Sequence, residues 1–330
     1  MFEPTDEQPH PHGDDPLYSE SLYFNFVDSE SGVAGFMRMG NRVLAGHGEV
    51  TVCLYLPAGT VAFRYSRPPI SEPTYALDGL SVDVAAPLQR NVVRYDGEVH
   101  ELASGTALED PRRAFAENPV RRCELELDFD DAMPLFGWKQ EDADGADADG
   151  AFAPNHYEAI CRVRGSVRLD GHSHPIDCSG VRDHSWGPRH WQGPEYYRWV
   201  SGLTPDGEGF IAWLMKARGE LRSWGYLRDA GETHAIKGVS VRSAYGQAPQ
   251  RYPESTVLEL DVDDGRRLRA EGTRLALAPL RHRSKDSPAV ARLSEMVVRF
   301  DGLDGEGSTY GICEFHDLIE NGHFAGLDEA

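Results

Sequence analysis

One short stretch of the sequence concentrates side chains that can move protons. Residues 178–191 read CSGVRDHSWGPRHW, with one acid, two histidines, two arginines and two tryptophans among glycine and proline. Side chains alternate along a strand, so Asp183 and Ser185 are expected to face one side and His184 and Trp186 the other. A histidine beside a tryptophan places a proton-transfer group next to an aromatic face that stabilises positive charge. Asp183, His184 and Trp186 are therefore the candidate catalytic residues.

Asp183 has two interpretations that the sequence leaves open. If the side chain is buried among aromatic residues, its pKa rises and it can serve as a proton donor. If it pairs with Arg182 or Arg189, which stand close to it in the sequence, it is part of a structural ion pair instead.

Aromatic residues continue downstream of this motif. Five of the six tryptophans lie between Trp186 and Trp224. A barrel of the expected size either fills its interior with side chains or holds one small ligand, so these residues form a core or line an apolar cavity. In the cavity interpretation, the predicted substrate-binding residues are Trp191, Tyr197, Trp199, Trp213 and Arg189.

The same region also contains potential metal ligands, namely His172, His174, Cys178, Asp183, His184 and His190. Their spacing matches no metal-binding pattern, so no metal site is predicted. The acidic run 141–150 (EDADGADADG) lacks the final glutamate and the flanking helices of a calcium loop, and is predicted to be a mobile surface loop. The absence of G-x-S-x-G, P-loop and G-x-G-x-x-G motifs argues against hydrolase, kinase and dehydrogenase classes.

Strands must position these residues, because apolar and polar residues alternate at period two on both sides of the motif. Examples are 49–56 (EVTVCLYL), 122–129 (RCELELDF), 209–216 (GFIAWLMK), 267–278 and 309–315. Asp-Gly turns separate several of these segments. Helical patterns are confined to 111–118 and 288–293. Many short strands without intervening helices predict an all-β fold of antiparallel barrels or sandwiches.

Length and charge restrict the classes of protein further. The 330 residues suffice for two domains. Fifty-four acidic against 33 basic residues give a formal charge of −21, which argues against nucleic acid as a partner. No transmembrane segment and no signal peptide are predicted, so the protein is expected in the cytoplasm. The five scattered cysteines are expected to be buried and reduced.

Residues 180–191 (GVRDHSWGPRHW) resemble the signature of the AttH-like and carotenoid 1,2-hydratase (hydroxyneurosporene synthase) superfamily, which includes kievitone-hydratase-like proteins and Diels-Alderases. Residues 23–42 and 311–315 (GICEF) fit as well. The resemblance implies two tandem lipocalin-like (calycin-type) antiparallel β-barrel domains, no organic cofactor, and a hydrophobic small-molecule ligand. It also matches His184 and Trp186 to a His-x-Trp pair of the hydratases. We expect a disordered tail over 1–17, followed by domains over 18–187 and 188–330.

The sequence departs from this superfamily at one point. The hydratases carry a Tyr-x-Asp on a following strand, whereas the comparable residues 209–216 contain no carboxylate. Either Asp183 or another group, such as Glu195, Glu314 or Tyr197, protonates the substrate, or the reaction is not hydration. The departure favours cyclisation or isomerisation over hydration. It also favours a protein that binds a lipid without catalysis.

Two hypotheses of function follow. The first is a cofactor-independent lyase (hydratase) or cyclase/isomerase that protonates an alkene of a lipophilic, isoprenoid-like substrate in an apolar cavity. The alternative is a non-catalytic carrier of a hydrophobic small molecule. The sequence fixes neither the ligand nor the oligomeric state.

Overall fold

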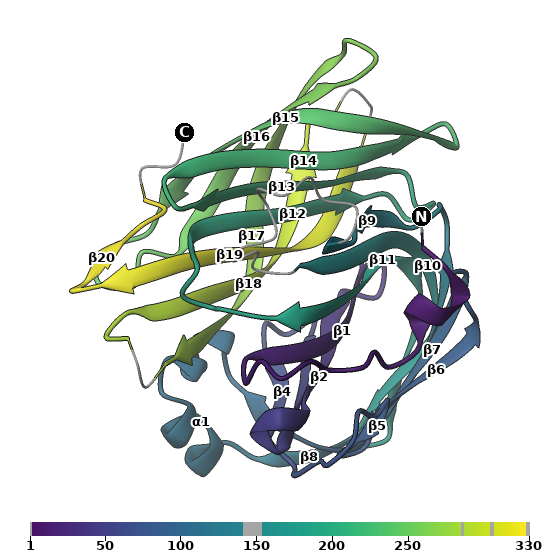
Figure 1. Ribbon diagram of the computed structural model, residues 1–330, viewed down its shortest axis with the longest axis vertical. Coiled ribbons are helices and arrows are strands. Elements are labelled where there is room, and N and C mark those ends of the chain that lie inside the picture. Colours follow the sequence, from purple (N-terminus) through teal and green to yellow (C-terminus); the bar gives the residue numbers. More distant parts are fainter. Residues whose placement is uncertain (1, 141–153, 285–286, 304–306, 328–330) are drawn as a thin grey trace. The chain divides into compact units, whose positions relative to one another are not determined.

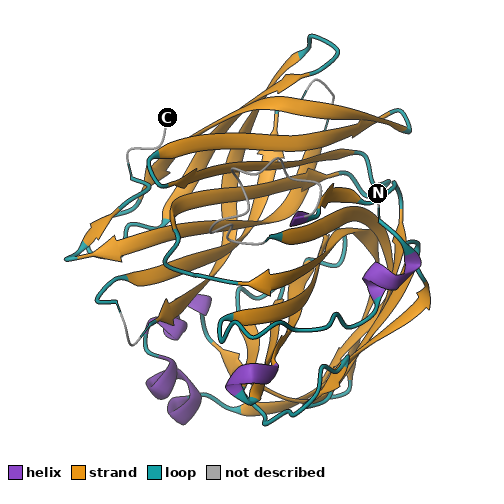
Figure 2. Ribbon diagram, in the orientation of Figure 1, coloured by secondary structure: helices purple, strands orange, loops and turns teal. Residues whose placement is uncertain are grey.

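A computed structural model describes residues 2–140, 154–284, 287–303 and 307–327, most of which lie in strands (Figure 2). The described residues fall into two compact units. Unit 1 lies within Met1–Ala103 and Arg112–His190, and unit 2 within Ser104–Pro111 and Trp191–Ala330. The chain thus passes from unit 1 to unit 2 after His190, three residues beyond the expected boundary, and unit 2 also includes an early segment. The acidic run 141–150 lies outside the described residues.

Eight strands of unit 1 form a closed antiparallel sheet (Figure 1). Their order is β4-β3-β2-β1-β11-β10-β8-β7, and pairing of β4 with β7 closes the ring. Three further strands extend it: β6 pairs with β7, β5 with β6, and β9 with β10. The bounds are β1 (Tyr18–Asp28), β2 (Val33–Arg42), β3 (His47–Tyr55), β4 (Val61–Ser66), β5 (Ala76–Leu77), β6 (Leu80–Ala86), β7 (Arg90–Leu102), β8 (Val120–Asp131), β9 (Phe136–Trp138), β10 (Asn155–Leu169) and β11 (His172–Pro188).

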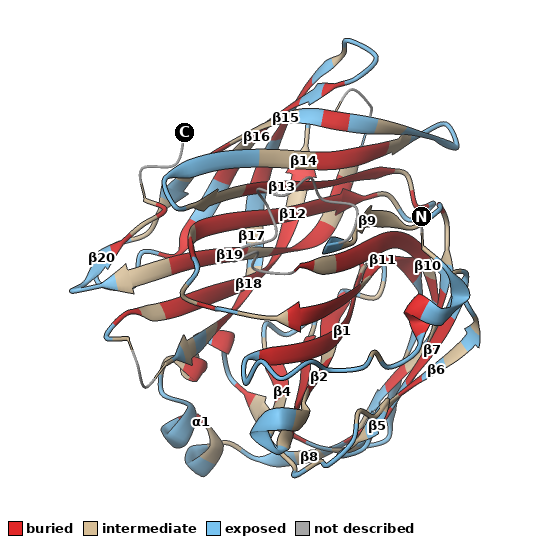
Figure 3. Ribbon diagram, viewed as in Figure 1, coloured by how far each residue is buried: buried red, intermediate tan, exposed pale blue. Residues whose placement is uncertain are grey.

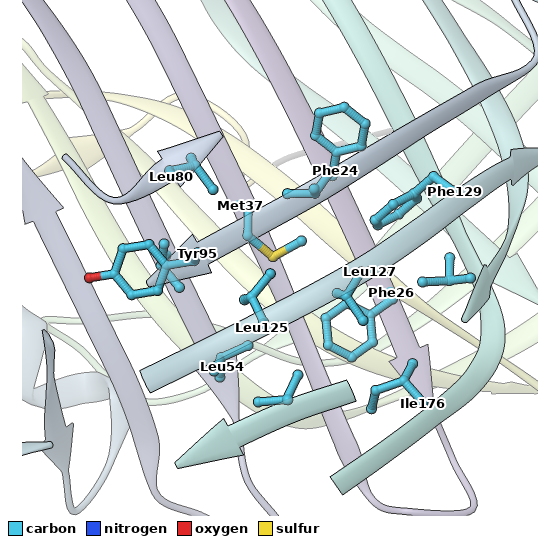
Figure 4. Packing of buried hydrophobic residues seen from close by; sticks show 14 of the residues in the cluster. Phe24, Phe26, Met37, Leu54, Leu80, Tyr95, Leu125, Leu127, Phe129 and Ile176 are labelled. Carbon is cyan, nitrogen blue, oxygen red and sulfur yellow. The ribbon is translucent and has the colours of Figure 1, made fainter. Parts of the chain in front are cut away.

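The interior of this ring is packed with apolar side chains (Figure 4). Phe24 of β1 and Phe129 of β8 meet edge to face, with ring centroids 5.0 Å apart, although their strands are not neighbours in the sheet. Such a contact has to cross the ring. Because side chains alternate along a strand, every second side chain enters this core and the others face away from it.

Unit 2 repeats the arrangement with eight consecutive strands. Strands β12 to β19 follow one another around the sheet, and β12 pairs with β19 to close it. Phe210 and Phe300 meet edge to face at 5.4 Å in its core. The bounds are β12 (Pro194–Leu203), β13 (Gly209–Ala217), β14 (Glu220–Asp229), β15 (Glu232–Tyr245), β16 (Pro253–Val262), β17 (Arg267–Arg283), β18 (Val290–Asp301), β19 (Ser308–Glu320) and β20 (His323–Phe324). The predicted all-β fold of two antiparallel, lipocalin-like barrels is confirmed.

Helices are few and short. Of the two predicted helical segments, 111–118 is confirmed as α1 (Pro111–Glu117). The prediction for 288–293 is wrong, because Val290 begins β18, which pairs with β17 and β19 along both edges. The remaining helices are 3-10 turns: η1 (Pro4–Glu7), η2 (Val43–Ala45) and η3 (Gly105–Glu109). No helix in the described ranges is long and apolar enough to cross a membrane.

The segment before β1 is structured over residues 2–17, where the sequence predicts a disordered tail. Two ion pairs join η1 to the rest of unit 1. Glu7 lies 2.9 Å from the Arg182 guanidinium, and Asp6 lies 2.8 Å from Lys139 Nζ. Glu7 is almost fully buried. Composition alone misses these contacts because their partners are far away in the sequence. All five cysteines are free and buried, as predicted.

Candidate active site

Strand β11 carries the candidate catalytic residues, and it is buried along most of its length (Figure 3). It lies between β1 and β10, and the register aligns Asp183 with Tyr23 on one side and Glu158 on the other. His184 is aligned with Leu22 of the packed interior. Asp183 and His184 therefore face opposite sides of the sheet, as their alternation predicts.

Asp183 lies in a cluster of ionisable groups on the outer face of unit 1. Its carboxylate is 3.4 Å from Nδ1 of His156, whose Nε2 is 3.5 Å from Glu158. Burial raises the pKa of Asp183, while the charges of His156 and Arg189 act in the opposite direction without cancelling it. Burial would lower the pKa of His156, but Asp183 and Glu158 hold it above its ordinary value. Both groups therefore retain their protons to higher pH than they would in water.

The ion pair between Asp183 and Arg182 that the sequence allows does not form. Arg182 points to the interior and makes two 2.6 Å hydrogen bonds to Asp131, in addition to its contact with Glu7. Arg189, a predicted substrate-binding residue, donates a 2.8 Å hydrogen bond to Ser185, on the face that carries Asp183. The charge of Arg189 thus acts to lower the pKa of Asp183, whereas Arg182 pairs with Asp131 instead.

His184 and Trp186 belong to a second cluster, inside the ring of unit 1. Nδ1 of His184 is 3.0 Å from the Tyr157 hydroxyl, and Nε2 is 3.0 Å from Glu20. His10 stacks on Trp186 at 3.9 Å and lies 2.9 Å from the same carboxylate. Burial would raise the pKa of Glu20, but the hydrogen bonds from both histidines lower it. Both ring nitrogens of His184 are therefore engaged within the protein.

Two tyrosine hydroxyls share this interior. Those of Tyr18 and Tyr75 are buried without a hydrogen-bond partner among the described residues. Burial raises the pKa of both phenols, and the negative charge of Glu20 adds to the effect. The Tyr75 ring meets His184 edge to face, with centroids 6.3 Å apart.

Two of the predicted substrate-binding aromatics, Trp199 and Trp213, form a row with Trp224 on the outer face of unit 2. The register aligns Trp199 of β12 with Trp213 of β13, and Trp213 with Trp224 of β14. Ring centroids along the row are 5.4 and 5.6 Å apart. The flanking residues Val200 and Ala212 enter the core, so by alternation the tryptophans point away from it. These tryptophans are not the barrel core.

An acid adjoins this row. Glu314 of β19 is aligned with Trp199, and Glu295 of β18 is aligned with Glu314. The Tyr197 hydroxyl donates a short hydrogen bond to Glu314. Two of the three replacement acids named from the sequence, Glu314 and Tyr197, therefore meet beside the tryptophans.

Trp191 lies at the start of unit 2 and stacks on His282, with centroids 4.1 Å apart. Its carbonyl oxygen is 3.0 Å from Nε2 of His316. Tyr197 stacks on the other histidine, His316, at 4.9 Å. Trp191 thus packs with histidines and is not a member of the tryptophan row.

The sequence did not identify the partners that complete either cluster of unit 1. His156 and Glu158 stand two apart on β10 and share a face, which is a signal that alternation offers. His10, Glu20 and Tyr157 come from three separate segments, and only pairing of β1 and β10 with β11 unites them. Among the described residues, His10, Glu20 and His184 form one group with metal-ligand spacing, and His156, Glu158 and Asp183 form another.

One family model and several solved structures match this chain. A family model described as a domain of unknown function (DUF7064) matches residues 3–319. No curated protein matches the sequence. A solved structure of a candidate AttH protein from Nitrosomonas europaea is 18% identical, with a TM-score of 0.60 over 96% of each chain. CghA is 12% identical, with a TM-score of 0.57 over 93% of this chain and 90% of its own. Kievitone hydratase from Nectria haematococca is 11% identical, with a TM-score of 0.55 over 90% and 88%. The expected AttH-like fold is thus confirmed.

Proposed function

The chain belongs to the DUF7064 family of domains of unknown function, and we propose that it is an acid–base enzyme that needs no organic cofactor. In this proposal it protonates an alkene of a lipophilic, isoprenoid-like substrate, and hydration or ring closure follows. The observation that carries the proposal is Asp183, whose pKa is raised by burial and whose carboxyl group lies 3.4 Å from His156. A general acid has to hold its proton near neutral pH, and a raised pKa serves that purpose.

The chemistry balances with Asp183 as the only group that changes protonation state. The Asp183 carboxylic acid transfers its proton to one alkene carbon, which forms a C–H bond and leaves a cation on the other carbon. Water adds to the cation and returns a proton to the Asp183 carboxylate, so the net reaction is addition of water. In ring closure, a second alkene attacks the cation and a C–H proton returns to Asp183.

Aromatic faces close to the acid support the same chemistry. Tyr23 is aligned with Asp183 and stacks on Phe36, and Trp138 lies 4.8 Å from His156. An aromatic face near a desolvated cation contributes about 1–2 kcal/mol. The fold is shared with kievitone hydratase, which is named for hydration, and with CghA, whose structure is also known with Sch210972. These likenesses support hydration or cyclisation as the type of reaction. The assignment of the acid rests on Asp183 and His156.

The test begins with native mass spectrometry of the purified protein and identification of any lipophile that it retains. That lipophile and a panel of acyclic isoprenoids are then incubated with the protein in D₂O. We expect one deuterium to be incorporated at carbon, with a mass increase of one D₂O for hydration. Asp183→Asn should abolish incorporation and retain binding.

Asp177→Asn is the matched control, because Asp177 occupies the same strand and face as Asp183 but is exposed. Incorporation that survives Asp183→Asn and disappears in Glu314→Gln would assign the acid to unit 2 instead. A retained lipophile with no incorporation in any protein would favour the carrier function.

A further inference from the structure

We propose that His10, Glu20 and His184 form a zinc site inside unit 1. They are drawn from the segment before β1, from β1 and from β11, and their ligand atoms all lie within 4.8 Å of one another. Oε1 of Glu20 is 2.9 Å from Nδ1 of His10 and 3.0 Å from Nε2 of His184. Two nitrogens and one carboxylate oxygen are ligands that zinc prefers.

The spacing needs little adjustment to accept the ion. Donors bound tetrahedrally to zinc at about 2.1 Å lie about 3.4 Å from each other. Each contact to Glu20 therefore has to lengthen by about half an ångström. The Glu20 and His184 side chains are almost fully enclosed, with exposed fractions of 0% and 1%, which holds both in place.

Each imidazole has an oxygen close to its outward nitrogen. A histidine that binds zinc through one nitrogen carries its proton on the other, and that proton usually meets a carboxylate, a carbonyl or a similar oxygen. For His184 this oxygen is the Tyr157 hydroxyl, 3.0 Å from Nδ1. For His10 the nearby carboxylate of Asp6, which is paired with Lys139, lies 3.8 Å from Nε2 and has to move closer to accept that proton. His184 thus has the outer partner that a zinc ligand requires, and His10 has a carboxylate close to its outward nitrogen.

Unsatisfied polar atoms around the group point the same way. The hydroxyls of Tyr18 and Tyr75 are buried without hydrogen-bond partners in the described part of the chain. Tyr18 lies two residues before Glu20 on the same face of β1, and the Tyr75 ring meets His184 edge to face, with centroids 6.3 Å apart. Buried polar atoms without partners are rare, and two of them share the interior of unit 1 with Glu20 and His184. A water bound to the ion would offer these hydroxyls a hydrogen-bond partner.

The ion would attach the N-terminal segment to the barrel, because His10 lies outside the sheet and the other two ligands lie within it. The site is distinct from the proposed acid, since His184 and Asp183 face opposite sides of β11. It accordingly requires neither catalytic activity nor a known substrate to be tested.

The experiment uses full-length protein treated with a chelator and dialysed. Calorimetric titration with Zn²⁺ should give one site per chain, and the melting temperature should rise on addition of the ion. Co²⁺ in place of Zn²⁺ should give the visible absorption of a tetrahedral ion. His10→Ala should weaken zinc binding by more than about 100-fold, and Tyr157→Phe by roughly 10–100-fold as an outer-shell change.

His12→Ala is the matched control, because His12 is exposed, lies two residues from His10 and should leave binding unchanged. His156→Ala tests the other group with metal-ligand spacing and should also bind zinc normally. Circular dichroism establishes that each variant is folded. The proposal is overturned if chelator-treated wild type binds no zinc, if His10→Ala binds it as wild type does, or if His156→Ala removes it.

Discussion

Asp183 and His184 are consecutive in the sequence, yet they belong to different clusters on opposite faces of β11. Asp183 lies 3.4 Å from His156 on the outer face, whereas His184 lies 3.0 Å from both Tyr157 and Glu20 inside the ring. The His-x-Trp pair and the acid before it are thus separated by the alternation of one strand. A single motif in the sequence supplies two sites of different character.

The position of Asp183 predicts how its neighbours tune the pH dependence of activity. The acid must be protonated, so kcat/KM should fall as pH rises through the pKa of Asp183. His156 lowers this pKa and Glu158 raises it. His156→Gln should therefore move the alkaline limb of the pH–rate profile to higher pH, and Glu158→Gln should move it to lower pH.

Opposite shifts are the distinctive outcome, because general damage to the site moves both profiles in the same direction or only lowers the rate. Asp177→Asn, at an exposed position of the same strand, should leave the limb in place. Identical limbs in all three variants would exclude Asp183 as the titrating acid.

The tryptophan row predicts that Trp213→Ala impairs ligand binding by more than its loss of folding stability explains. Trp213 stacks between Trp199 and Trp224. Trp213→Ala should cost about 3–5 kcal/mol of unfolding free energy and should abolish retention of a lipophile, measured by urea unfolding and native mass spectrometry. Trp213→Phe, which keeps an aromatic face, should retain part of the binding.

Phe300→Ala separates the two effects. Phe300 lies in the core of unit 2 and packs against Phe210, so its removal should also cost about 3–5 kcal/mol but leave the outer row intact. Equal loss of lipophile in Phe300→Ala and Trp213→Ala would argue that binding only reports stability.

Gly180, within the motif, is predicted to have a structural role. A Cβ at this position would lie 2.0 Å from the carbonyl oxygen of Asn25 on the neighbouring strand β1. Gly180→Ala should therefore destabilise the protein by about 1–3 kcal/mol, as overpacking does, in a urea titration. Gly13→Ala, where nothing lies within 4 Å, should change stability by less than about 0.5 kcal/mol. Equal stability of the two variants would contradict close approach of β1 and β11.

Strands were predictable where one period dominated, but the face that enters the core was predictable only where the other face of the strand is exposed. Alternation in 122–129 gave β8 its interior face because its other face is exposed. In β12 both faces are buried, so alternation separates Trp199 from Val200 but does not say which enters the core. The helix expected over 288–293 fails for a related reason, since pairing with β17 and β19 overrides local preference.

The sequence identifies the motif residues of the candidate site but not the residues that contact them. Asp183 and His184 stand out as types in a dense motif, but their partners depend on which strands flank β11. His156 is 27 residues before Asp183, and Glu20 is separated from His184 by most of unit 1. Such pairings are fixed by closure of the sheet, which a single sequence does not reveal.

His316 predicts an acid-dependent loss of stability in unit 2. Burial lowers the pKa of His316 to about 4, well below its ordinary value of 6.5. The folded state therefore holds fewer protons on this group than the unfolded state does, and stability is lost as pH falls from about 6.5 toward 4. The shift corresponds to roughly 3 kcal/mol.

His316→Gln keeps an N–H donor for the Trp191 carbonyl and cannot titrate, so its unfolding free energy should fall less than that of wild type over this interval. Urea titrations at a series of pH values give the difference. His323→Gln, at an exposed position of the same unit, should follow wild type at every pH, and parallel curves for His316→Gln and wild type would refute a buried neutral imidazole.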